Sequence, residues 1–143
     1  MPRYVARRTL PAPVEEVWAL LAEAERFAEW WPGVERVVPT VRRALAPGAL
    51  WQVEGATRPS LLRRPQLSGT LLVLEVEPLR RLAFQLSGER LEAELAFEPV
   101  EDGETLATLA VVAPRLVGVG RAFPSQALAR LAALVRGRGG PAT

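Results

Sequence analysis

The sequence predicts an α+β protein in which a curved antiparallel sheet of about seven strands grips one long C-terminal helix. Before residue 113, most of the chain alternates between apolar and polar residues, and Pro- or Gly-containing turns separate the alternating stretches. This pattern is typical of antiparallel strands joined by hairpins. Residues 119–136 instead repeat apolar residues at steps of three and four, which is typical of a helix. We therefore expect the order β-α-α-β6-α, with an apolar pocket between the sheet and the last helix.

The N-terminal part predicts one strand followed by two short helices. Residues 3–10 alternate loosely and end at Pro11, so we expect the first strand there. Pro13 stands where a helix favours proline, and the two glutamates that follow suit the positive end of the helix dipole. A second short helix is expected over residues 24–31 and is ended by Pro32-Gly33.

Six further strands are expected over residues 34–45, 49–57, 67–76, 81–87, 91–98 and 105–112. The first of them is long enough to bend at Pro39, and residues 58–66 are expected to form a loop. In the strand over 67–76, we expect Thr70, Leu72 and Leu74 to share the inner face with Val76. The clearest alternation, over residues 91–98, predicts one buried and one wet face.

The C-terminal helix is expected over residues 119–136. Its apolar stripe contains Ala127, Leu128 and Leu131, whereas Ala132 is expected on the opposite side. Pro124 lies inside the pattern, so the regular helix is expected to begin there. We expect Gly137 to end the helix, which gives one domain over residues 1–136 and a flexible tail over 137–143.

The composition excludes several kinds of chemistry. The chain contains no cysteine and no histidine, so it cannot form disulfides, a thiolate nucleophile, or a histidine-based triad or metal site. Acid–base catalysis would have to use a glutamate, Asp102, Tyr4 or a bound water. We therefore predict no catalytic residue, no metal ion and no cofactor.

The charged residues do not indicate a nucleic-acid binder. All 18 basic residues are arginines, against 16 acidic residues, and the arginine pairs are spread along the chain rather than gathered in one segment. We therefore expect no nucleic-acid partner. We also expect a cytoplasmic location, because no apolar run is long enough for a membrane span and the N-terminus lacks a signal-peptide pattern. The absence of thermolabile Asn and Cys, with 13 prolines, is compatible with a thermophilic source.

The element order and one sequence motif resemble a known superfamily. Residues 11–18, PAPVEEVW, followed by residues 27–34, FAEWWPGV, resemble the opening of the START-related superfamily, also called SRPBCC. That superfamily includes polyketide cyclase/dehydrases, lipid-transfer-like proteins and coenzyme Q-binding proteins. The resemblance implies the helix-grip fold and an internal cavity that binds a lipid, an isoprenoid or quinone, or a polyketide-like molecule. It transfers no catalytic role to a residue of this chain.

The candidate ligand-binding residues are mostly aromatic or aliphatic. Trp30 and Trp31 would point about 100° apart on a helix, so one would pack in the core and the other would line the pocket mouth, unless both fill the helix–sheet junction. Arg58 lies in a loop where it could hold an anionic head group, and Thr70 could offer an orienting hydroxyl. The remaining candidates are apolar residues expected on inner faces: Trp51, Leu72, Phe84, Phe97, Phe123 and Ala127.

Three functions agree with these observations. The first is the binding or transport of a small hydrophobic ligand in the cavity. The second is an enzyme of the cyclase, aromatase or dehydratase type, which would need a buried carboxylate or Tyr in the cavity. The third is a protein-interaction module, which a filled interior would favour. The sequence leaves the oligomeric state open.

Overall fold

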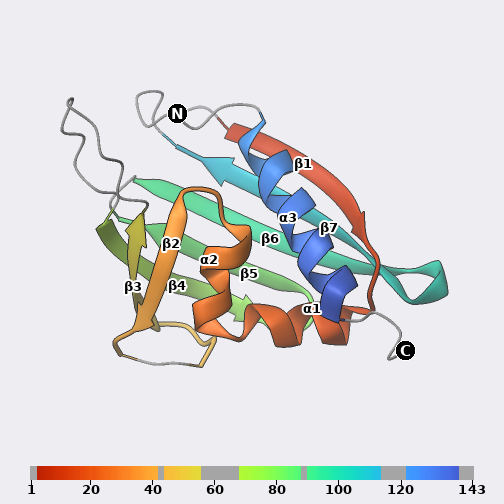
Figure 1. Cartoon of the computed structure of the whole chain (residues 1–143), viewed down its shortest axis with the longest axis horizontal. Coiled ribbons are helices and arrows are strands. Elements are labelled where there is room, and N and C mark those ends of the chain that lie inside the picture. Colours follow the sequence, from red (N-terminus) through yellow and green to blue (C-terminus); the bar gives the residue numbers. More distant parts are fainter. Residues whose placement is uncertain (1–2, 42–43, 56–67, 88–89, 114–121, 139–143) are drawn as a thin grey trace.

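The structure, a computed structural model, describes residues 3–41, 44–55, 68–87, 90–113 and 122–138. Its sheet has seven antiparallel strands in the order β1-β7-β6-β5-β4-β3-β2 (Figure 1). The strands are β1 (Arg3–Leu10), β2 (Val34–Pro39), β3 (Leu50–Gly55), β4 (Ser68–Glu77), β5 (Arg81–Leu86), β6 (Leu91–Val100) and β7 (Glu104–Val112). The helices are α1 (Val14–Leu21), η1 (Ala24–Arg26), α2 (Phe27–Trp30), η2 (Glu101–Gly103) and α3 (Phe123–Arg138).

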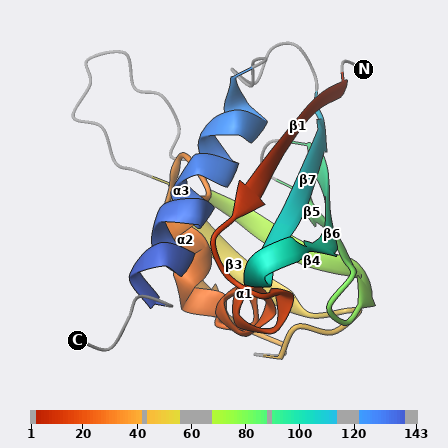
Figure 2. The same ribbon diagram turned by 90° about the vertical axis from the view of Figure 1, so that its right-hand side faces the viewer.

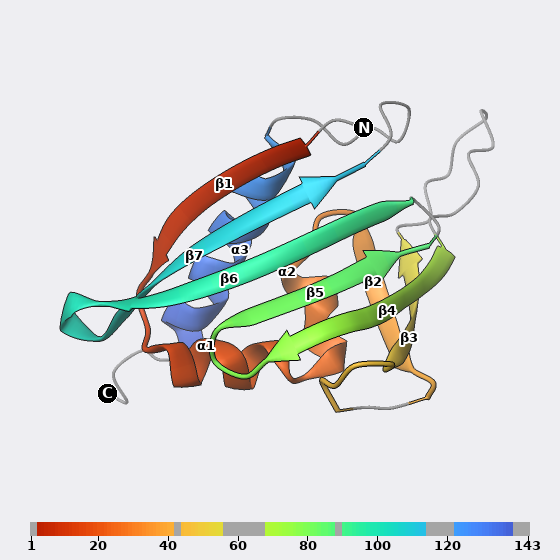
Figure 3. The same cartoon turned by 180° about the vertical axis from the view of Figure 1, so that it is seen from behind.

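The three α-helices lie on the same face of the sheet. Seen edge-on, α1, α2 and α3 stand on one side and the strands on the other (Figure 2). Helix α3 runs along the β1 and β7 side and α2 lies beside β2, whereas α1 follows the end of β1 and lies near the C-terminal end of α3. Among the described residues, no helix covers the opposite face (Figure 3). The predicted order β-α-α-β6-α and the helix-grip architecture are therefore confirmed.

The predicted long strand over residues 34–45 is wrong, because β2 ends at Pro39. The backbone N–H groups of both Thr40 and Val41 donate to the carbonyl of Leu50, at 3.0 and 3.2 Å, instead of continuing the ladder. The Thr40 hydroxyl donates to the same carbonyl at 2.9 Å. Side-chain hydrogen bonds of this kind compete with strand pairing and favour a turn. The chain therefore leaves the sheet here, and Leu45 lies in the connection to β3.

The inner face predicted for β4 is also wrong. Leu71 and Val73 are buried, so Thr70 and Leu72, which alternate with them, lie on the outer face. The pairing with β5 is irregular between Val73 and Glu75, as in a β-bulge. A bulge inserts one residue and reverses the alternation, so Val76 returns to the inner face and packs against the core.

Helix α3 begins about where its regular part was predicted to begin and runs past its predicted end. It begins at Phe123, so Pro124 falls in the first turn, as expected for the regular part of the helix. It continues through Gly137 to Arg138, because an exposed glycine in the last turn weakens a helix without ending it. Ala132 is buried and belongs to the packed side. Residues 119–121 and 139–143 of the predicted helix and tail lie outside the described residues.

The core lies between the helices and the inner face of the sheet. The predicted alternation in β6 is confirmed, because Leu91, Ala93, Leu95 and Phe97 are all buried. Thr105 is the one buried polar or charged residue of the described chain, and its hydroxyl donates to the carbonyl of Ala12 at 2.8 Å. No helix among the described residues is long and apolar enough to cross a membrane.

The turn between β4 and β5 holds Leu79 in the left-handed region, with φ of 67°. This conformation costs a non-glycine residue about 1–2 kcal/mol. We expect Leu79→Gly to remove that strain. Leu74→Gly is the matched comparison, because Leu74 is equally exposed, at 37%, but lies within β4, where glycine weakens the strand. Urea denaturation should therefore find Leu79→Gly more stable than Leu74→Gly by about 1 kcal/mol or more. Equal losses of stability would show that the turn is not strained.

Candidate functional site: an apolar cavity at the helix–sheet junction

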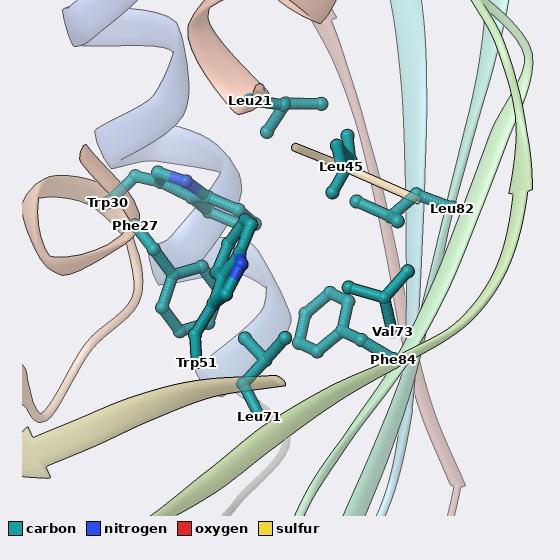
Figure 4. A pocket seen from close by; sticks show the side chains of 9 residues that line it. All are labelled: Leu21, Phe27, Trp30, Leu45, Trp51, Leu71, Val73, Leu82 and Phe84. Atoms are coloured by element: carbon teal, nitrogen blue, oxygen red, sulfur yellow. The ribbon is translucent and has the colours of Figure 1, made fainter. Parts of the chain in front are cut away.

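A cavity lies where α1 and α2 meet the inner face of β3, β4 and β5 (Figure 4). The side chains around it point toward one another from both layers. Its lining consists of nine residues, all of them apolar: Leu21, Phe27, Trp30, Leu45, Trp51, Leu71, Val73, Leu82 and Phe84. None of them belongs to α3, so this cavity does not lie at the expected position between the sheet and the last helix. The cavity lies at the other end of the sheet.

The cavity is narrow, and one of its lining residues is partly exposed to solvent. Its free volume is about 10 Å³, about the space that one water molecule needs. Eight of the nine lining residues are buried, and Leu45 alone is partly exposed. Leu45 belongs to the irregular connection between β2 and β3 and lies next to Leu21 and Leu82 in Figure 4. As the one partly exposed residue of the lining, Leu45 marks the side of the cavity nearest to solvent, which we call its mouth.

Trp31 lies directly behind the cavity wall. Its ring stacks on Phe27, with centroids 5.3 Å apart and planes 18° apart. It also meets Phe84 edge-on at 5.3 Å, Trp30 at 5.5 Å and Phe123 at 5.2 Å. Edge-to-face and offset pairs at these distances are favourable for aromatic rings. We refer to these five rings as the aromatic cluster, and three of them, those of Phe27, Trp30 and Phe84, line the cavity.

The two tryptophans are both buried, so neither lies at the mouth as one of them was expected to do. Trp30 is the last residue of α2, and Trp31 follows it in an extended conformation, with φ of −86° and ψ of 117°. The 100° separation assumed a continuing helix, whereas the extended backbone turns the second ring back toward the first. The rings meet at an interplanar angle of 85°. This is the alternative arrangement, in which both fill the helix–sheet junction.

The indole N–H of Trp31 is the unusual polar group of this region. Trp31 is fully buried, and none of the described residues accepts a hydrogen bond from its Nε1. A buried donor without an acceptor costs about 1–3 kcal/mol relative to a satisfied one. Such groups are rare in folded proteins, and each one needs a physical explanation.

The structure brings three of the ten candidate residues to the cavity: Trp30, Trp51 and Phe84. Trp31 and Phe123 belong to the aromatic cluster behind it. Phe97 is buried against Trp18, with ring centroids 6.2 Å apart, and Ala127 is buried on α3. Thr70 and Leu72 lie on the outer face of β4, and Arg58 lies outside the described residues.

Sequence reasoning missed six lining residues: Leu21, Phe27, Leu45, Leu71, Val73 and Leu82. Leu21 and Leu82 lie in a predicted helix and a predicted strand, where their apolar character gave no reason to place them at a cavity rather than in the core. Phe27 carried a usable signal, because it precedes Trp30 by three residues and therefore lies on the same side of the helix as that candidate. Leu45 was missed because the predicted strand over residues 34–45 included it, whereas β2 ends at Pro39.

The lining supplies contact surface and no acid–base group. None of the nine residues has an ionisable side chain, and the described residues contain no cluster of acidic side chains suited to a metal ion. The charged groups of the sheet instead gather on its outer face, where Arg81 forms ion pairs with Glu94, Glu75 and Glu77. The hydrogen bonds to Glu94 and then to Glu75 raise the pKa of Arg81 above its ordinary range, so it stays charged.

Comparisons with known proteins agree with this architecture. Residues 1–137 match the family described as polyketide cyclase / dehydrase and lipid transport. A crystal structure from Nitrosomonas europaea is 18% identical with a TM-score of 0.71, covering 97% of each chain. One from Thermus thermophilus is also 18% identical with a TM-score of 0.71, covering 96% of this chain and 99% of that one. At this identity, these likenesses establish the fold alone. No curated protein matches the sequence.

Proposed function

The chain belongs to the family of polyketide cyclase/dehydrase and lipid transport proteins, and we propose that it binds a small hydrophobic molecule in the cavity between α1, α2 and strands β3 to β5. The observation that carries the proposal is the lining, which is apolar at all nine positions and rich in aromatic rings. Ligand sites are mostly of this composition. The ligand classes that suit it are lipids, isoprenoids or quinones, and polyketide-like molecules.

Binding of this kind draws its free energy from the removal of apolar surface from water. The gain is about 25 cal/mol for each Å² of apolar surface buried. An aromatic wall also offers flat faces and edges against which a ring or an unsaturated chain can stack. Trp30, Trp51 and Phe84 supply such surfaces from three different elements. The lining therefore suits a flat or elongated hydrocarbon better than a compact polar solute.

The cavity has to widen to accept such a ligand. Small-molecule pockets usually measure about 300–1,000 Å³, whereas the free volume here is about 10 Å³. The lining residue best placed to move is Leu45, because it is partly exposed and lies outside the sheet. Opening at Leu45 leaves the strand pairing of β3, β4 and β5 intact. We therefore expect the ligand to enter past Leu45 and to select an open form of the cavity.

Native mass spectrometry of the freshly purified protein tests the proposal. We expect a mass that exceeds the chain mass by that of one apolar molecule, and that returns to the chain mass on denaturation. Leu45→Trp places a bulky ring at the mouth and should reduce the bound fraction strongly. Val5→Trp introduces the same ring at an exposed position on the edge strand β1, which contributes no residue to the lining, and should retain the ligand.

A clean apo mass, together with no thermal shift from lipids, quinones and aromatic polyketides, would reject the proposal. That result would favour a second candidate, a protein-interaction module, which the small free volume of the interior supports. The enzyme alternative needs an ionisable group at the ligand, and the nine lining residues contain none. Turnover of the captured molecule would show that the protein is an enzyme, and its catalytic group would then have to lie outside these nine residues.

A further inference from the structure

The buried indole N–H of Trp31 points to the chemistry of the ligand. Four rings contact Trp31, and three of them, those of Phe27, Trp30 and Phe84, also line the cavity. The rings of Phe27, Trp30 and Phe84 therefore separate Trp31 from the cavity. A ligand that widens the cavity by displacing Phe27 or Phe84 meets Trp31 next.

The fully buried N–H of Trp31 can raise the affinity for a ligand that brings a hydrogen-bond acceptor, in addition to the gain from burying hydrocarbon surface. In the free protein, the N–H has lost its hydrogen bonds to water and has gained none from the described residues. An acceptor brought by a ligand therefore forms a hydrogen bond without first displacing a protein partner. The desolvation of the donor has already taken place on folding, so the new bond adds to affinity.

We propose that Trp31 Nε1 donates a hydrogen bond to an uncharged acceptor oxygen of the ligand. The ligand class that follows is a hydrophobic ring system or chain that carries a carbonyl or ether oxygen. A carboxylate is disfavoured, because the apolar lining offers no cation to balance a buried charge. The inference rests on the proposed function, since it assigns the polar atom that the ligand of that same cavity presents.

The test compares two probes of nearly the same shape, menadione and a methylnaphthalene. Both have the same fused ring skeleton and methyl group, but only menadione carries carbonyl oxygens. The quinone cannot form a thiol adduct with this chain, because the chain contains no cysteine. We expect the wild-type protein to bind menadione about three- to tenfold more tightly than the hydrocarbon, which is the gain from one net hydrogen bond.

Trp31→Phe removes the N–H and keeps an aromatic ring in the cluster. We expect this variant to bind both probes with similar affinity. Trp18→Phe is the matched control, because Trp18 packs against Phe97 outside the cavity lining. It should keep the preference for menadione. If Trp31→Phe also keeps the preference, the assignment of the donor is overturned while the binding function stands.

A spectroscopic measurement on the wild-type protein decides the question even if Trp31→Phe does not fold. The chain has four tryptophans, so a ¹⁵N-correlated spectrum contains four indole N–H signals. We expect one of them, assigned to Trp31, to move downfield with menadione and to move differently with the hydrocarbon. Equal shifts with both probes would overturn the inference. If neither probe binds the wild-type protein, the proposed function itself fails and the inference fails with it.

Discussion

Replacing Phe84 with alanine is expected to lower the free energy of unfolding by about 3–5 kcal/mol. Phe84 is 1% exposed on β5, and it both lines the cavity and belongs to the aromatic cluster. Its ring meets Phe27 at 5.5 Å and Trp31 at 5.3 Å, both edge-on. The variant loses these two contacts as well as the buried phenyl surface, because the surrounding sheet and helices relax only in part. Urea denaturation measures the loss.

The same substitution should enlarge the cavity and strengthen the binding of small hydrocarbons. Apolar cavities of the order of 150 Å³ created by truncating a core side chain stay dry and bind benzene. We therefore expect benzene to raise the stability of Phe84→Ala more than that of the wild-type protein. A loss of stability below about 1 kcal/mol would contradict the central packing of Phe84.

Phe97→Ala provides the matched control for the binding of a methylnaphthalene. Phe97 is buried on the same face of the neighbouring strand β6, but it contacts Trp18 and does not line the cavity. We expect Phe97→Ala to lose a comparable amount of stability and to leave the affinity for this probe unchanged. Phe84→Ala should change that affinity. Equal changes in the two variants would mean that the probe binds elsewhere.

Regular alternation made most of the sheet predictable. In β6, apolar residues at every second position alternate with Glu92, Glu94 and Glu98, so one register alone buries the apolar set. In β4, the run Leu71 to Leu74 is apolar throughout, so the pattern does not say which face is inner. The bulge between Val73 and Glu75 then reverses the alternation. Which residues of β4 face the core therefore depends on its pairing with β5, and the local sequence of β4 does not reveal that pairing.

The cavity was harder to predict than the sheet, because it is formed by contacts between distant segments. Leu21, Trp51 and Leu82 come from α1, β3 and β5, which meet only in the folded protein. A single aromatic residue in a sequence is compatible with a filled core and with a cavity wall alike. The backbone at Trp31 adds a second difficulty, since its extended conformation decides the direction of the ring. Sequence reasoning therefore expected the right residue types but placed the pocket beside α3, whereas the cavity of the structure lies beside α1 and α2.

The position of α3 leads to the second large expected effect, which concerns Leu131. This residue is fully buried in the middle of α3, the helix that runs along β1 and β7. We expect Leu131→Ala to lower the free energy of unfolding by about 2–5 kcal/mol. Leu134→Ala, on the same helix at a partly buried position, should cost clearly less. Urea denaturation of the two variants makes the comparison, and equal losses would contradict the packing of α3.

Leu131→Ala also separates the stability of the fold from binding at the cavity. None of the nine lining residues belongs to α3, so the loss of Leu131 should leave the cavity wall unchanged wherever the protein remains folded. We expect Leu131→Ala to bind a methylnaphthalene with wild-type affinity, measured at a temperature below its unfolding transition. An affinity that falls with Leu131→Ala but not with Leu134→Ala would place the ligand against α3. The site would then lie between the sheet and the last helix, and the cavity beside α1 and α2 would be core.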